Sequence, residues 1–451
     1  MDVSEERLSV TVYVIFLSLL FLMAAFCFEV RALPLVVTGQ VQRPAVLGFV
    51  HLVVVGFVLQ MMFGVLIKIV PIAFSGTLHS RPLALVHPPL LALGAAGLAT
   101  GFFSSRVSLV IAGGILIVLA AAAVLYNLMR TFATLRKPTA VVFGVQNALF
   151  YIAVALLLGL TMALNFRWTF IPDLNTFIQL HIEVALFAGF TLLVSSISYK
   201  LLPMFLLAIK PKTHPYANYS LLNAGILLAA AALLIHSPSM STIAKWLAAA
   251  MWVIGFAVHV YDAFVIAKSR HRKTIAIPIY AVLSAYSVWV GASVALALLW
   301  AGQRLTRASA GFGFFTLVMA GLVPMILGYL LKMIPFMWFQ YRYSHAPDRR
   351  SAPPLNLLVK EVQGVWAIAG YGAGVVVSLA GAVSGLFGTA ASNGAWTDSS
   401  TVIAIGVVLQ FCSVAYLTYL LTLVPRKHPK RRSVSLGEFQ NPPANDPSKE
   451  P

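Results

Sequence analysis

The sequence predicts an all-α polytopic membrane protein with about twelve transmembrane helices, arranged as three pseudo-symmetric units of four. Three observations support this fold class. Hydrophobic residues make up 60% and charged residues 10% of the 451 positions, whereas a soluble domain carries roughly 25% charged residues. The apolar residues form long runs, unlike the short alternating strands of an outer-membrane barrel. A lysine also recurs every 132 residues, at Lys68, Lys200 and Lys332.

Twelve apolar segments are long enough to cross a bilayer core of about 30 Å, which takes roughly 20 helical residues. We number these spans 1 to 12 in chain order. We expect them at about residues 9–30, 45–73, 85–104, 107–130, 140–164, 176–207, 217–236, 242–267, 276–302, 311–340, 360–386 and 401–424.

The spans form one predicted transmembrane domain over residues 1–432. Its repeat units are expected at about 9–135, 140–272 and 276–424. Residues 433–451 are polar and proline-rich, a composition that predicts a disordered cytoplasmic tail.

Basic residues predict the orientation of the spans. With the N-terminus inside, the outer loops hold only seven of the 31 Lys and Arg residues. The positive-inside rule therefore places both termini in the cytoplasm, and we expect a multi-pass protein of the bacterial inner membrane. The net charge of +18 reflects this asymmetry and an attraction to anionic lipid. The bilayer is the expected partner, and nucleic acid is not.

The recurring lysines lie in a shared phrase, Lys-x-x-Pro, at the expected cytoplasmic ends of spans 2, 6 and 10. There a lysine can extend to the headgroups, and a proline can end the helix. Nineteen and 17 residues before each lysine stand equivalent pairs at one expected depth in the outer part of the membrane. The pairs are Phe49 and His51, His181 and Glu183, and Gly313 and Phe315.

This arrangement resembles subunit I of the haem–copper oxidases, a family with twelve helices in three groups of four. The phrase from Ser198 to Phe205 is similar to helix 6 of the C-type oxidase and nitric-oxide-reductase branch. The resemblance covers about residues 10–425. It implies that His51 is an axial ligand of a low-spin haem, and that His181 or Glu183 is a copper ligand.

The chain departs from that family at several metal ligands. Span 10 has Gly313-Phe314-Phe315 where the family carries a His-x-His pair. Span 7 has only His236, at its outer end, where the family carries two copper-binding histidines. The resemblance therefore supports the scaffold and one cofactor site, and it does not support a complete oxygen-reducing binuclear centre.

His51 is the strongest candidate ligand, because an ionisable residue inside a membrane helix suggests function by default. The alternative is a histidine that forms hydrogen bonds between helices. His181 and Glu183 are two residues apart and point to different helix faces. One can bind the cofactor or a metal while the other carries a proton, or both can lie in the wet headgroup zone.

His259 and Asp262 on span 8 share a helix face, and they suit a proton-uptake role in the cytoplasmic half. The alternative is an interfacial salt link near Lys268. Glu29 stands beside Arg31, so we expect a charge-paired position at the interface. We assign no chemistry to the histidines in or beside the expected cytoplasmic loops, which are His79, His87, His214, His271, His345 and His428.

These observations favour a haem-binding, oxidase-like membrane protein that acts in respiratory electron transfer or in nitric oxide or oxygen handling. Copper is a further possible cofactor. We expect a respiratory partner subunit or electron donor, because the chain shows no covalent-haem motif and no soluble electron-entry domain. Two alternatives remain open: a non-enzymatic metal-binding or assembly scaffold for a respiratory complex, and a polytopic transporter.

Overall fold

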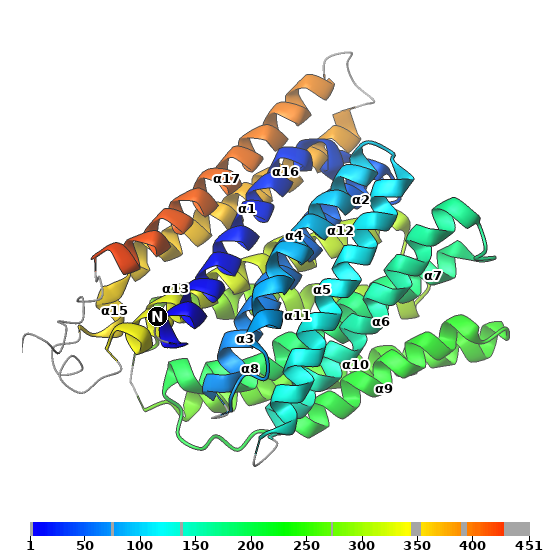
Figure 1. The fold of residues 1–451 in the computed structure, drawn as a ribbon. Helices are drawn as coiled ribbons and strands as arrows, with labels where there is room; N and C mark the ends of the chain where they lie inside the picture. Colours follow the sequence, from blue (N-terminus) through cyan, green and yellow to red (C-terminus); the bar gives the residue numbers. More distant parts are fainter. Residues whose placement is uncertain are drawn as a thin grey trace, which may run out of the picture.

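The computed structural model describes residues 3–73, 76–135, 139–271, 274–343, 353–388 and 395–427. These residues contain twelve helices long and apolar enough to cross a membrane, which confirms the predicted number of spans (Figure 1). They form no β-strand apart from one isolated bridge between Ala208 and Arg270. The predicted tail, 433–451, lies outside the described residues, as do His345 and His428.

Nine spans are single helices and three are composite. The single helices are α1 (Val3–Val37), α4 (Arg81–Phe103), α5 (Val107–Ala133), α6 (Ala140–Trp168), α9 (Pro215–Leu234), α10 (Pro238–Lys268), α11 (Ile277–Ala301), α16 (Glu361–Gly388) and α17 (Ala395–Lys427). Span 2 consists of α2 (Pro44–His51), η1 (Leu52–Leu59) and α3 (Gln60–Ala73). Span 6 consists of α7 (Leu174–Ile182), η2 (Glu183–Phe190) and α8 (Thr191–Leu206). Span 10 consists of α12 (Arg307–Phe315), η3 (Thr316–Leu322) and α13 (Val323–Arg342). A short helix, α15 (Leu355–Leu358), precedes span 11.

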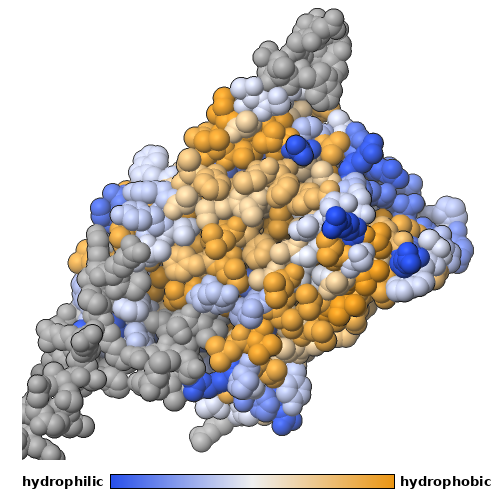
Figure 2. Space-filling model, turned by 45° about the horizontal axis from the view of Figure 1, so that its top comes forward, coloured by the Kyte–Doolittle hydropathy of each residue, from blue (hydrophilic) through white to orange (hydrophobic). Residues whose placement is uncertain are grey.

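The spans run roughly parallel to one another, so the bundle has two ends (Figure 1). We call the end that holds the N-terminus the proximal end and the end that holds residues 38–43 the distal end. Hydrophobic residues form a broad band on the face in Figure 2, with hydrophilic residues toward its edges. Large apolar side chains such as Leu234, Phe264 and Val376 are more than 60% exposed. Such a surface is stable in lipid and not in water.

The three Lys-x-x-Pro phrases lie at the proximal end, but the prolines do not stop their helices. Pro71, Pro203 and Pro335 all lie inside helical segments, and α13 continues to Arg342. Neighbouring helices can satisfy the backbone carbonyl that a proline leaves free. Lys332 forms an ion pair with Glu361 in the first turn of α16, so this lysine is held by a carboxylate inside the protein.

Spans 2, 6 and 10 each contain a π-helical segment that the sequence did not predict. The segments η1, η2 and η3 fall at nearly equivalent points relative to the recurring lysines. In each segment, a glycine faces the preceding span. A Cβ added to that glycine would lie 2.6 to 2.9 Å from the nearest side chain of the preceding span. The pairs are Gly56 with Phe21, Gly189 with Ile152, and Gly321 with Trp289. π-Helical turns are frequent at functional sites.

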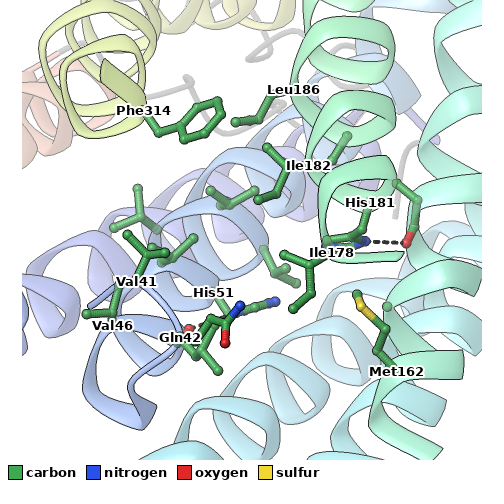
Figure 3. A pocket seen from close by; sticks show the side chains of 18 of the residues that line it. Val41, Gln42, Val46, His51, Met162, Ile178, His181, Ile182, Leu186 and Phe314 are labelled. Carbon is green, nitrogen blue, oxygen red and sulfur yellow. Dashed lines mark hydrogen bonds between the residues drawn. The ribbon is translucent and has the colours of Figure 1, made fainter. Parts of the chain in front are cut away.

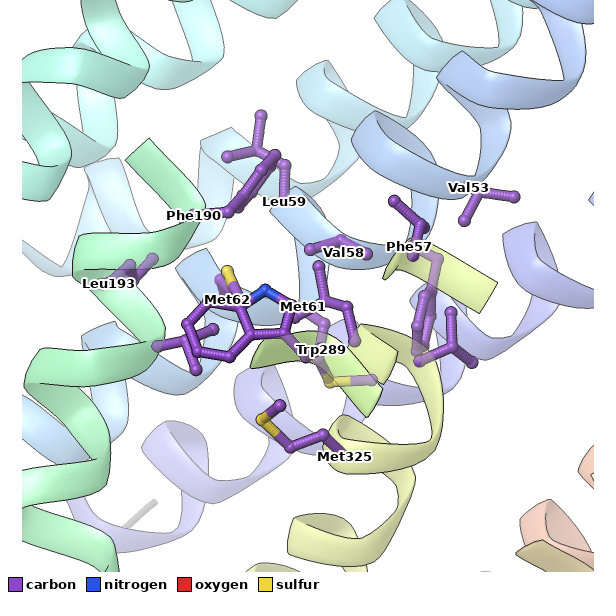
Figure 4. Close-up of a cluster of buried hydrophobic side chains, with 14 of the residues drawn as sticks. Val53, Phe57, Val58, Leu59, Met61, Met62, Phe190, Leu193, Trp289 and Met325 are labelled. Atoms are coloured by element: carbon purple, nitrogen blue, oxygen red, sulfur yellow. The ribbon is translucent and has the colours of Figure 1, made fainter. Parts of the chain in front are cut away.

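Large side chains fill the middle of the bundle between spans 2, 6, 9 and 10. Met61, Met62 and Met325 gather near Trp289, with Phe190 beside them (Figure 4). All five are less than 9% exposed. Thioether side chains adapt to irregular gaps around aromatic rings. The centre of the bundle is therefore packed, and open space occurs nearer the distal end.

Candidate functional site

A cavity of about 600 Å³ lies in the distal half of the bundle. Residues from spans 1 to 6, 9 and 10 and from the loops before α2 and α12 line it. It brings together Phe49, His51, His181, Glu183 and Phe315, five of the six positions equivalent by the repeat. The sixth, Gly313, faces α11, where an added Cβ would lie 2.5 Å from Leu296.

His51 presents one ring nitrogen to this cavity. Its Nδ1 lies 2.7 Å from the carbonyl oxygen of Leu47, one turn earlier in α2. Because a carbonyl can only accept, Nδ1 carries the proton and the neutral ring leaves Nε2 as a free acceptor. Phe102 packs beside the ring, at a centroid distance of 5.3 Å. In metal-binding histidines, a hydrogen bond from the other ring nitrogen fixes the orientation and the tautomer of the imidazole.

His181 is held in the same way from a different helix. Its Nδ1 donates to the carbonyl oxygen of Ala155 in α6, at 2.9 Å, so its Nε2 is also left free (Figure 3). The ring fits closely over Gly159, where an added Cβ would lie 3.1 Å from His181 Cε1. In Figure 3 the two histidines reach into the cavity from α2 and α7, with Ile178 between them in this view.

Glu183 is the carboxyl group of the cavity. Its Oε2 is buried without a hydrogen-bond partner, and the charge of Lys245 in α10 acts on it. An unpaired carboxyl oxygen in this setting is costly unless it holds a proton, a water or a ligand.

Apolar side chains make up most of the remaining wall. Phe49 and Phe315 stack at a centroid distance of 6.3 Å, and Phe314, Leu186 and Met319 extend the apolar surface. A cavity of this size is typical of cofactor and small-molecule sites, which are mostly apolar with a few placed polar groups. Two free imidazole nitrogens among aromatic walls fit a haem-like group.

The helix that covers the cavity has no buried residue. None of the residues of α7 is buried, and α7 packs mainly against α6 and η2. Its start is capped by Asp173, which accepts from the Thr176 hydroxyl at 2.6 Å and from the Asn175 amide at 3.1 Å. The hydrogen bond from the Thr176 hydroxyl is the main reason why the pKa of Asp173 lies below its usual value.

A second polar cluster lies in the proximal half and is centred on Asp262, which is fully buried. Asp262 accepts hydrogen bonds from the Tyr199 hydroxyl at 2.8 Å and from the His214 amide at 2.7 Å. His214 Nδ1 lies 3.0 Å from the other carboxyl oxygen. The alternative, a salt link near Lys268, is not what the described residues form, because Asp262 pairs with His214.

His259 shares this cluster, as its spacing from Asp262 predicted. Its ring meets Tyr199 edge-on at 4.9 Å and lies 5.2 Å from the ring of Tyr286. Both its nitrogens are buried without a hydrogen-bond partner, as are the Tyr286 hydroxyl and the Ser195 hydroxyl. Buried polar atoms of this kind are normally satisfied by internal water. The cluster connects to the surface through His214, whose side chain is 57% exposed.

Sequence reasoning missed several of these contacts. Neither Tyr199 nor His214 was given a role in a site. His87 was expected beside a loop, but it is buried in α4. Glu29 was expected in a charge pair, but it is fully buried and bonded to Gln410. Only the exact Lys200 repeat, one residue after Tyr199, could have drawn attention to that tyrosine.

The described residues contain no group of three His, Cys, Asp or Glu side chains that could hold a metal ion. His51, His181 and Glu183 all line the cavity, but they do not form such a group. Comparison with protein-family models and with curated proteins finds no match for this chain.

Proposed function

We propose that this chain is a haem-binding membrane protein that takes part in respiratory electron transfer or in nitric oxide or oxygen handling. One observation carries the proposal: two imidazoles, His51 and His181, project into one apolar cavity, each with Nδ1 on a backbone carbonyl and Nε2 free. A bound haem would supply an iron that exchanges single electrons and binds diatomic gases.

The residues of this chain would hold and tune such a group. The carbonyls of Leu47 and Ala155 fix the two imidazoles with Nε2 toward the cavity. The apolar wall would limit water at the iron, which affects its potential. Glu183 provides a group that can take up or release a proton beside the cavity.

The three-unit architecture and the orientation belong to the same proposal. Support for three units comes from the recurring π-helical segments, whose glycines pack against spans 1, 5 and 9. Support for a cytoplasmic proximal end comes from its excess of basic residues. The setting we propose is the bacterial inner membrane, with a partner subunit or another electron donor.

Haem titration of the purified protein tests this function. The wild type should bind about one haem per chain, and His51→Ala or His181→Ala should weaken binding at least about tenfold. The matched control is His236→Ala, because His236 is exposed and does not line the cavity. Folded wild-type protein that binds no haem would contradict the proposal and would favour the assembly-scaffold or transporter alternatives.

A proton-transfer role for the proximal cluster is a second candidate, favoured by the unpartnered polar atoms around Asp262 and His259. His214 would exchange protons with the aqueous side, and Asp262 would pass them inward toward Tyr199. Asp262→Asn should slow proton uptake when the reduced protein forms, as measured with a pH indicator. The exposed Asp173→Asn is the control, and an unchanged rate in Asp262→Asn would contradict this role.

A further inference from the structure

Glu29 is a buried carboxyl group that the proposed haem site does not use. It lies in α1 and is fully buried where α1 packs against α16 and α17. Its Oε1 accepts a hydrogen bond from Gln410 Nε2 at 2.8 Å. The same nitrogen donates to Ser378 Oγ at 3.1 Å. Two atoms of this group remain without partners and buried: Glu29 Oε2 and Gln410 Oε1.

An ionised Glu29 does not suit this arrangement. No described Lys, Arg or His forms an ion pair with it. An unpaired carboxylate inside a membrane protein is costly, and here two unpartnered oxygens would belong to one bonded pair of side chains. Tyr371 is a described titratable group close enough to interact electrostatically with Glu29, but it is neutral and its hydroxyl already donates to the carbonyl oxygen of Met319 at 2.7 Å.

We propose that Glu29 and Gln410 form a proton-binding site inside the membrane. The bound proton sits on Glu29 Oε2 and is donated to Gln410 Oε1, while Gln410 Nε2 donates to Glu29 Oε1. This closed pair of two hydrogen bonds satisfies both unpartnered oxygens with one proton. It joins the first span to the last, and it does not depend on the proposed haem.

The site also has a structural connection to the cavity. Tyr371, beside Glu29, donates to the backbone of Met319 within η3, and Met319 lines the cavity. Loss of the proton would place a charge next to Tyr371 and disturb this contact. Proton binding at Glu29 is therefore positioned to affect the wall of the distal cavity.

Infrared spectroscopy of the full-length protein in lipid nanodiscs tests the proposal. The wild type at neutral pH should show a protonated-carboxyl C=O band that Glu29→Gln removes. Glu29→Gln should fold normally, because an amide can form the same closed pair with Gln410. Glu183→Gln is the matched control, since it removes another intramembrane carboxyl and should leave the Glu29 band in place.

Gln410→Leu provides the second readout. It should keep the Glu29 band but shift it to higher frequency, because the carboxyl loses both hydrogen bonds to the amide. Identical spectra for the wild type and Glu29→Gln would overturn the proposal. So would an unshifted band in Gln410→Leu. If sodium, compared with choline, raised the melting temperature of the wild type but not of Glu29→Gln, the ligand would be a small cation and the proton assignment would be wrong.

Discussion

The hydrogen bond between Tyr199 and Asp262 gives a sharp test of the proximal cluster. Tyr199→Phe removes only the hydroxyl, which lies 2.8 Å from Asp262 Oδ2. Tyr199 is 8% exposed and Asp262 is fully buried, so water cannot easily replace the bond. A buried hydrogen bond to a carboxyl group contributes about 1–3 kcal/mol. The free energy of unfolding should fall by that amount in a denaturant titration in detergent.

Asp262→Ala should lower the free energy of unfolding by more than Tyr199→Phe does. The loss should still be smaller than that of three full hydrogen bonds. The His214 side chain is 57% exposed, so its ring nitrogen can turn to water and this contact contributes little. The buried Tyr199 hydroxyl and the His214 amide account for most of the loss, roughly 2–5 kcal/mol together.

A double-mutant cycle separates this bond from general packing. In the Asp262→Ala background, Tyr199→Phe should cost less than about 0.5 kcal/mol, because its partner is already gone. Tyr216→Phe, at an exposed tyrosine, should change stability by no more than about 0.5 kcal/mol in either background. Equal costs of Tyr199→Phe in the wild type and in Asp262→Ala would refute the reasoning.

Three further predictions concern other parts of the fold. Gly159→Leu should reduce haem binding without unfolding the protein, because the new side chain enters the cavity beside His181. The control is Gly372→Ala, which should bind haem like the wild type because nothing lies within 4 Å of the added Cβ. Lys332→Met alone should lower the free energy of unfolding by about 3–5 kcal/mol, because it leaves the Glu361 carboxylate unpaired in a mostly buried site. The double variant with Glu361→Leu should recover part of this loss in the same denaturant titration. No recovery would contradict the pairing. The lowered pKa of Asp173 means that its cap stabilises α7 above the ordinary value of 3.8 and is lost as pH falls through the lower folded-state pKa. The protection factor of the Asn175 amide, its exchange rate relative to an unstructured peptide at the same pH, should then fall at acid pH, and in Asp173→Ala it should be low at all pH values.

The sequence was sufficient to predict the spans and to single out His51, His181 and Glu183, which all line the distal cavity. Long apolar runs determine where helices cross a bilayer, and each predicted span overlaps an observed one. The 132-residue repeat selected His51, His181 and Glu183, because equivalent positions on equivalent helices lie at one depth. The first span runs further than expected, past Arg31 and Pro34 to Val37, since neither residue is enough to stop a helix that packs along its length.

Contacts between distant spans could not be predicted in the same way. The bond from Asp262 to Tyr199 joins span 8 to span 6, and the bond from Gln410 to Glu29 joins span 12 to span 1. A single sequence contains no signal for such pairs, because helical periodicity describes one helix at a time. The π-helical segments were missed for a related reason: the wider turn depends on how each span packs against its neighbour.

The optical difference spectrum of the purified protein, dithionite-reduced minus air-oxidised, tests the central claim most directly. We expect a haem Soret band and α-band in the wild type that weaken in His51→Ala and stay unchanged in His236→Ala. A flat spectrum from folded wild-type protein expressed with haem supplied would contradict the claim that this cavity holds a haem.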